Sequence, residues 1–231
     1  MQTNTTVLGL SALSSILTPI ASAGNPALYT DRALFEAQAG TLQIEGFEAE
    51  PLADLVMPAA FASGLGVRLA SGQVTGFIDA GDPFDNAFIN TTDGGRKYLA
   101  FGRDGVNADG SPLYETGSYS VEFALTETSN SFGFDLSGVI LQHTAMGFSV
   151  TTLDNGQVRD DFFFASDQIF GVRFYGFTTG LSFDTVRIHI SADAGIADYA
   201  AFDEVSWRAV PSPGGIILLA FGGLAATRRR R

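Results

Sequence analysis

The 231-residue sequence contains no cysteine. This absence excludes a disulfide scaffold, thiolate zinc sites, iron–sulfur clusters and a cysteine nucleophile. Basic residues are scarce, with 13 Lys and Arg against 25 Asp and Glu, for a formal net charge of -12. Such a chain has little with which to neutralise the phosphates of a nucleic acid, so we exclude nucleic-acid binding. Its 45% hydrophobic residues are too many for a disordered chain.

Signatures of common enzymes are also missing. The sequence has two histidines and neither a His-Glu-x-x-His nor a Gly-x-Ser-x-Gly pattern. His189 alternates with an apolar set and so points away from it, beside Arg187, as a surface residue does. Neighbouring carboxylates such as Asp203 and Glu204 face opposite sides of an extended strand, so they cannot flank one glycosidic bond. We predict a protein without enzymatic activity; a glycosidase or polysaccharide lyase is the less favoured alternative.

The N-terminal segment has the pattern of a secretory signal. The first 23 residues carry no charged side chain, and residues 7–17 form an apolar run. The small residues Ala21 and Ala23 stand where signal peptidase cuts, before Gly24. The usual Lys or Arg near the start is absent. Residues 1–23 are predicted to be a cleavable signal peptide; the alternative is a buried N-terminal helix.

The C-terminal segment, residues 209–231, joins a Pro-Ser-Pro motif, an apolar stretch and four arginines. The apolar stretch at 214–227, if helical, spans roughly 21 Å, which is short of a hydrocarbon core of about 30 Å. The arginines would stay on the cytoplasmic side. We expect transient membrane insertion through this segment; an ordinary tail anchor is the alternative.

This tail resembles a PEP-CTERM sorting signal, which exosortases recognise in Gram-negative-type bacteria. The family usually shows Pro-Glu-Pro where this chain has a serine between the prolines. The resemblance implies that an exosortase processes the protein and that it is located at the cell envelope, on the cell surface or outside the cell. The residues of the sorting motif are Val210, Pro211, Ser212, Pro213, Arg228, Arg229, Arg230 and Arg231.

Residues 24–208 form the predicted domain between these ends. Without the four C-terminal arginines the basic count falls from 13 to 9, so the mature domain carries a net charge of -16. Apolar and polar residues alternate at 119–125, 132–136 and 186–190, a pattern typical of half-buried antiparallel strands. We therefore predict an all-β fold, an antiparallel β-sandwich, most simply a jelly roll.

Local signals add a hairpin and one short helix. Asp154-Asn155-Gly156 suits a tight turn between two strands. Residues 30–40 begin with a capping residue and end at Gly40, which predicts a short helix at the edge of a sheet.

The aromatic stretch at 162–177 is apolar on both of its faces. It fits either a central strand covered on both sides or a strand that lines a binding groove. In the second interpretation Tyr175, Phe177 and Arg173 would contact the ligand. Phenylalanine lacks the polar tip that sugar-stacking rings use, which favours the core.

Two pieces of the domain are similar to galactose-binding-like jelly rolls, a group that includes many carbohydrate-binding modules. They are Ile44-Glu-Gly-Phe-Glu48 near the start and Ala201-Phe-Asp-Glu-Val-Ser-Trp207 at the end. In that group the first and last strands meet around a structural calcium ion. The resemblance implies Glu48 and Asp203 as side-chain ligands of calcium, and no other cofactor is expected.

Together these features predict an exported, surface-sorted protein that binds or organises extracellular polysaccharide at the envelope or in a biofilm matrix. The alternative is a purely structural surface or matrix protein with no specific ligand. Signal peptidase and an exosortase are the expected partners during export.

Overall fold

A computed structural model describes residues 25–72, 74–80, 97–102, 118–137, 147–165, 172–191 and 200–210. Of the residues singled out in the two terminal signals, only Val210 is described; the others, Gly24 included, lie outside the described residues. The elements are β1 Ala27–Tyr29, α1 Arg32–Ala39, β2 Gln43–Glu45, β3 Ala53–Asp54, β4 Ala59–Ala60, β5 Leu65–Ser71, β6 Thr75–Ala80, β7 Lys97–Gly102, β8 Tyr119–Ser137, β9 Gly147–Asp154, β10 Gln157–Ala165, β11 Arg173–Ile190 and β12 Ala200–Ala209.

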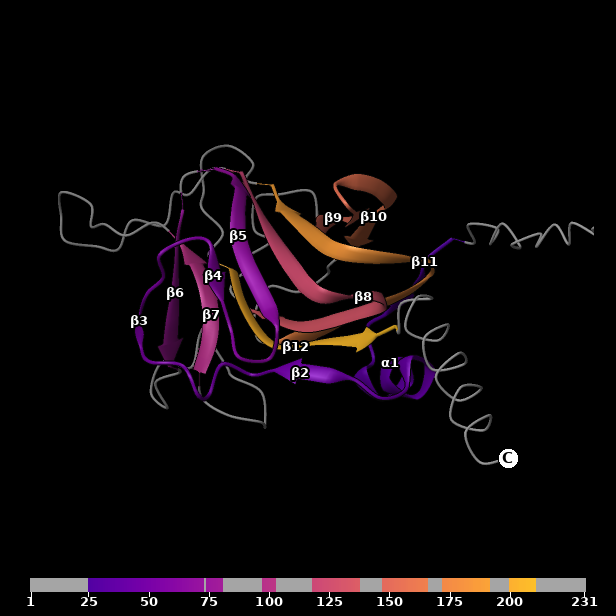
Figure 1. Cartoon of the computed structure of the whole chain (residues 1–231), viewed down its shortest axis with the longest axis horizontal. Coiled ribbons are helices and arrows are strands. Elements are labelled where there is room, and N and C mark those ends of the chain that lie inside the picture. The colour runs from indigo at the N-terminus through magenta and orange to yellow at the C-terminus, as the bar shows by residue number, and fades with distance from the viewer. Residues whose placement is uncertain are drawn as a thin grey trace, which may run out of the picture.

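The strands form two layers that share β8 and β11, the two longest strands (Figure 1). The first half of β8 pairs with β5 and with the second half of β11, whereas its second half pairs with β12 and with the first half of β11. The register of β8 against β11 shifts on either side of Phe183, between these two halves. Every strand pairing is antiparallel.

Each layer is named after one of its strands. The β10 layer contains β4, β5, β9 and β10 with the first half of β8 and the second half of β11. The β12 layer contains β1, β2, β3, β6, β7 and β12 with the other two halves. The predicted antiparallel sandwich with one short helix is confirmed; the passage of two strands through both layers was not predicted.

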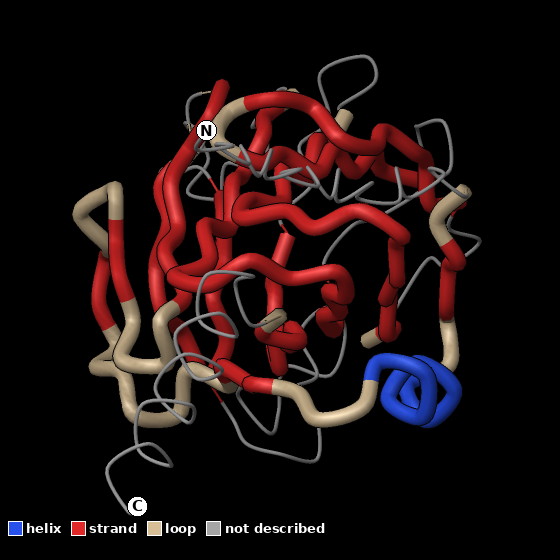
Figure 2. Tube along the Cα trace, turned by 45° about the vertical axis from the view of Figure 1, so that its right-hand side comes forward, coloured by secondary structure: helices blue, strands red, loops and turns tan. Residues whose placement is uncertain are grey.

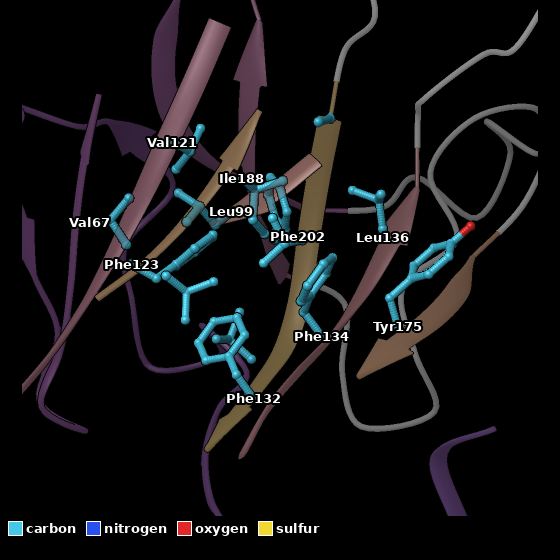
Figure 3. Close-up of a cluster of buried hydrophobic side chains, with 14 of the residues drawn as sticks. Val67, Leu99, Val121, Phe123, Phe132, Phe134, Leu136, Tyr175, Ile188 and Phe202 are labelled. Carbon is cyan, nitrogen blue, oxygen red and sulfur yellow. The ribbon is translucent and has the colours of Figure 1, made fainter. Parts of the chain in front are cut away.

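Phenylalanine dominates the core between the layers. The rings of Phe132, Phe134 and Phe202 lie among the labelled core side chains in Figure 3. Phe202 is 5.5 Å from Phe134 and 5.2 Å from Phe123 between ring centroids, at the tilted and edge-on angles that aromatic pairs prefer. The alternating apolar residues of 119–125, 132–136 and 186–190 all point into this core, as predicted.

The predicted turn and helix are also present, although the helix packs over a face of the sheet and not at its edge, because Phe35 is buried over Gly133 and Gly176. Asn155 and Gly156 connect β9 to β10 with φ of 51° and 78°, the left-handed backbone that two-residue hairpin turns require. In α1 the Asp31 carboxylate accepts a hydrogen bond from the Leu34 N–H at 3.0 Å, and Gly40 ends the helix at φ 81°. Figure 2 shows this helix outside the strand layers. Within the described residues, no helix has the length and apolar character needed to cross a membrane.

Candidate functional site

The aromatic stretch at 162–177 consists of two strands, because β10 ends at Ala165 and β11 begins at Arg173. Tyr175 and Phe177 are 3% and 0% exposed and belong to the core cluster, while Arg173 is exposed where β11 begins. Both rings are packed against other aromatic rings, so neither offers a face to a sugar. This corrects the binding-groove interpretation for Tyr175 and Phe177 in favour of the core.

The corner expected to hold calcium is formed where β2 pairs with β12. Glu48 lies in the turn after β2, and its Oε1 accepts a hydrogen bond from the Lys97 backbone N–H at 2.6 Å. The Lys97 ammonium donates to the backbone oxygens of Glu48, at 2.9 Å, and Glu50. Asp203 is buried, and its Oδ1 accepts from the Glu204 N–H at 2.7 Å.

A calcium ion at this corner would need six to eight oxygen ligands. Among the described residues no group of three or more His, Asp or Glu side chains is placed to hold a metal ion. The Lys97 ammonium also engages two of the backbone oxygens of the turn. The described residues by themselves do not fit the ion, and calcium binding through Glu48 and Asp203 stays a prediction from the resemblance.

The outer face of the β12 layer is covered by α1. Phe35 of the helix is fully buried, and its ring centroid lies 5.3 Å from that of Phe174. Gly133 and Gly176 are opposite one another on β8 and β11, and a Cβ on either would lie within about 3 Å of the Phe35 and Phe174 rings. Only glycine at both positions lets the two rings pack on the backbone.

An ion-pair network closes this covered face. Arg32 of α1 donates to Asp135 at 2.6 Å, lies 3.1 Å from a Glu204 oxygen and stacks over the Phe174 ring at 4.6 Å. Burial raises the pKa of Asp135 above its ordinary value by more than the Arg32 guanidinium lowers it. The network joins the helix to β8 and β12.

The outer face of the β10 layer carries two rows of side chains that cross adjacent strands, which we call the open face. Cross-strand register places the members of each row opposite one another on β5, β8, β11, β9 and β10. The first row is Arg68, Glu122, Arg187, Thr151 and Asp161. The second row is Ser71, Ser120, His189, Ser149 and Phe163.

Glu122 organises the first row. Its carboxylate is only 2% exposed and lies between two arginines. Oε1 accepts from Arg187 Nε at 2.8 Å and Nη2 at 2.5 Å, and Oε2 accepts from Arg68 Nε. Burial alone would raise the pKa of Glu122, but the hydrogen bonds from Arg187 and Arg68 outweigh it and hold the pKa below its ordinary value. The carboxylate therefore stays charged and fixes both guanidinium groups.

Hydrogen bonds also connect part of the second row. Ser71 Oγ donates to Ser120 Oγ at 3.0 Å, and Ser120 Oγ lies 2.9 Å from His189 Nδ1. At the far end Phe163 is 49% exposed, and its ring lies against Gly147, where a Cβ would come within 2.5 Å of the ring. The open face thus combines positioned donors and acceptors with one accessible aromatic ring.

Sequence reasoning found part of this site. His189 and Arg187 face away from the core on the same side, as predicted from their alternation with apolar residues. It did not find Phe163, whose neighbours Phe162 and Phe164 face the core side. The rows themselves depend on register between strands distant in sequence, which no local signal reveals.

The sequence matches no family model, and no curated protein is similar to it in sequence. Solved structures that resemble the chain include the K2 cleaved adhesin domain of Lys-gingipain, with a TM-score of 0.46, 11% identity and coverage of 72% of this chain and 99% of that one. For the xylan-binding module CBM86 from Roseburia intestinalis the TM-score is 0.37 and the identity 13%, with coverage of 74% of this chain and 97% of that one. For a cyclase from Fischerella sp. TAU the TM-score is 0.40 and the identity 14%, with coverage of 74% of this chain and 100% of that one. At these values the resemblances assign no function to this chain.

Proposed function

We propose that the protein is an exported, non-enzymatic surface protein that binds extracellular polysaccharide at the cell envelope through the open face. The observation that carries this proposal is the double row, which no other described segment covers and in which a buried carboxylate fixes two exposed guanidinium groups near an exposed ring. Residues held in place before binding lose less conformational freedom when a ligand arrives.

The chemistry of the open face suits a sugar chain. Sugars present hydroxyl groups that need hydrogen-bond partners and ring faces that stack on aromatic side chains. Phe163 offers a ring face but has no polar tip of its own, and the serine, histidine and arginine side chains of the two rows supply the hydrogen-bond partners. Adjacent strands lie about 4.8 Å apart, so five strands span roughly 19 Å. A surface of this width fits an extended polymer better than one small molecule.

The same residues support the absence of catalysis. Ser120 and His189 are as close as a nucleophile and its base, but Ser120 is buried. Among the described hydrogen bonds, no carboxylate orients the other nitrogen of the His189 ring. Glu122 is occupied by two arginines and buried, so it is poorly placed to act as an acid or base.

Binding can be tested by electrophoresis in gels that contain a dissolved polysaccharide, where a bound protein is retarded. Phe163→Ala should lose most of the retardation. Leu34→Ala is the matched control, because Leu34 is 63% exposed on α1, over the other layer. If no polysaccharide retards the protein, the purely structural alternative takes the place of this proposal.

Export and sorting need a separate measurement. The intact mass of the protein isolated from its native host should correspond to a chain that begins at Gly24 and lacks the four C-terminal arginines. A mature protein that still carries Arg228–Arg231 would refute exosortase processing while leaving polysaccharide binding unaffected.

A further inference from the structure

Building on the proposed function, we infer that the ligand of the open face is an acidic polysaccharide whose carboxylate groups are bound by Arg68 and Arg187, while Phe163 stacks on a neighbouring sugar ring. The juxtaposition that carries this inference is the pair of exposed guanidinium groups on either side of one buried carboxylate.

The contacts leave the outer parts of both arginines available for a ligand. Among the described hydrogen bonds, Glu122 accepts from Nε of Arg68 and from Nε and Nη2 of Arg187. The two side chains are 60% and 38% exposed, whereas the Glu122 side chain is 2% exposed. An approaching anion therefore meets guanidinium N–H groups and not the carboxylate. The planar fork of arginine matches the two oxygens of a carboxylate.

The two arginines differ in charge from the acidic domain that surrounds them. The mature domain carries a net charge of -16, so most of its surface repels an anionic polymer. Two arginines against one glutamate leave a local charge of +1 at this end of the row. Asp161 is the other carboxylate of the row. It lies on β10, three strands away from β8, which carries Glu122, and it accepts a hydrogen bond from Thr151. Acidic groups of the ligand are thus directed to β5, β8 and β11.

The spacing to the aromatic ring is compatible with one polymer chain. Phe163 is on β10 and Arg187 on β11, with β9 between them. Two strand spacings, about 10 Å, and an offset of two residues along the strands, about 7 Å, place the two positions about 12 Å apart, so separate sugars of one polymer chain can reach both side chains. The Phe163 ring would stack on a sugar whether or not that sugar is charged, and the two arginines would select for polymers that carry carboxylates.

The test uses three dissolved polymers with the purified protein: polygalacturonate, which carries carboxylates, dextran, which is neutral, and dextran sulfate. Polygalacturonate should bind about tenfold more tightly than dextran, and the preference should shrink as salt is added. Arg68→Gln should weaken binding of polygalacturonate about tenfold. Arg68→Lys, which keeps the charge but loses the fork, should bind with intermediate affinity.

Arg208→Gln is the control, because Arg208 is an exposed arginine on β12, outside the open face. Thermal melting of each variant shows that it is folded; Arg68 is mostly exposed, and Arg187 continues to pair with Glu122 in its absence. Equal affinity for dextran and polygalacturonate overturns the inference but leaves the proposed function standing. If Arg68→Gln and Arg208→Gln lose equal affinity for polygalacturonate, the binding is unspecific ion exchange and the inference is overturned. The same conclusion follows if dextran sulfate binds more tightly than polygalacturonate and both variants lose affinity for it equally. If none of the polymers binds, the proposed function fails with it.

Discussion

The two outer faces of the sandwich are built around opposite charge arrangements. On the β12 layer one arginine, Arg32, lies between two carboxylates, Asp135 and Glu204. On the β10 layer one carboxylate, Glu122, lies between two arginines. The first arrangement fastens α1 over the sheet, and the second holds cationic groups at a surface that nothing among the described residues covers.

Residue size explains why, in the part of the chain that the structure describes, a helix covers only one of the two faces. Gly133 and Gly176 leave space for Phe35 and Phe174 to pack on the backbone of the β12 layer. At the corresponding outer positions of the β10 layer, β8 and β11 carry Glu122 and Arg187. These long polar side chains keep an apolar helix away. The comparison teaches that the helix seals one face, whereas the other face presents a row of charged and polar side chains.

The largest expected effect concerns the covered face. Phe35→Ala should lower the free energy of unfolding by about 3–5 kcal/mol, because it removes a fully buried ring that holds α1 on the sheet. Urea denaturation measures this change. Leu34→Ala, the exposed neighbour, should change it by less than about 0.5 kcal/mol. Similar losses in the two variants would show that the helix is not held by Phe35.

Glu122→Gln should have a smaller effect, a loss of about 1–3 kcal/mol, because a charged acceptor of hydrogen bonds is replaced by a neutral one while both arginines can turn to solvent. The measurement is again urea denaturation at pH 7. An unchanged free energy of unfolding would mean that the row contributes nothing to stability and that its arginines are not fixed.

Acid should affect the two faces in opposite directions. The folded-state pKa of Glu122 lies below its ordinary 4.5, so its stabilisation is present above pH 4.5 and is lost as pH falls through the folded-state pKa. The folded-state pKa of Asp135 lies above its ordinary 3.8, so its contribution is complete below pH 3.8 and is lost as pH rises through the folded-state pKa.

Unfolding free energies measured across this acidic range should therefore separate two variants. Relative to the wild type, Glu122→Gln should lose less stability on acidification, and Asp135→Asn should lose more. The same slope in both variants would remove the electrostatic contrast between the faces.

Within the open face, the smallest stability effect is expected for Phe163→Ala. The ring is 49% exposed and packs on Gly147 with its other half, so its removal should lower the free energy of unfolding by about 1 kcal/mol. A loss near that of Phe35→Ala, seen in the same denaturation experiment, would show that Phe163 serves folding and not ligand binding.

Local sequence signals were sufficient for the alternating strand segments at 119–125, 132–136 and 186–190, for the hairpin and for the helix, because alternation, turn residues and capping residues act over short distances. The open face depends on pairing between distant residues: Arg68 lies 54 positions from Glu122, and Glu122 lies 65 positions from Arg187. The burial of Tyr175 was undecided in the sequence for the same reason. Whether a second layer covers a strand is set by the tertiary fold and not by the strand itself.

Side-chain footprinting with hydroxyl radicals, performed with and without polygalacturonate, tests most directly whether the open face is the binding face. Phe163 and Leu34 are exposed to similar extents, 49% and 63%, over different layers. Our account predicts that the polymer protects Phe163 and His189 from oxidation and leaves Leu34 unchanged. Protection of Leu34 without protection of Phe163 would contradict it.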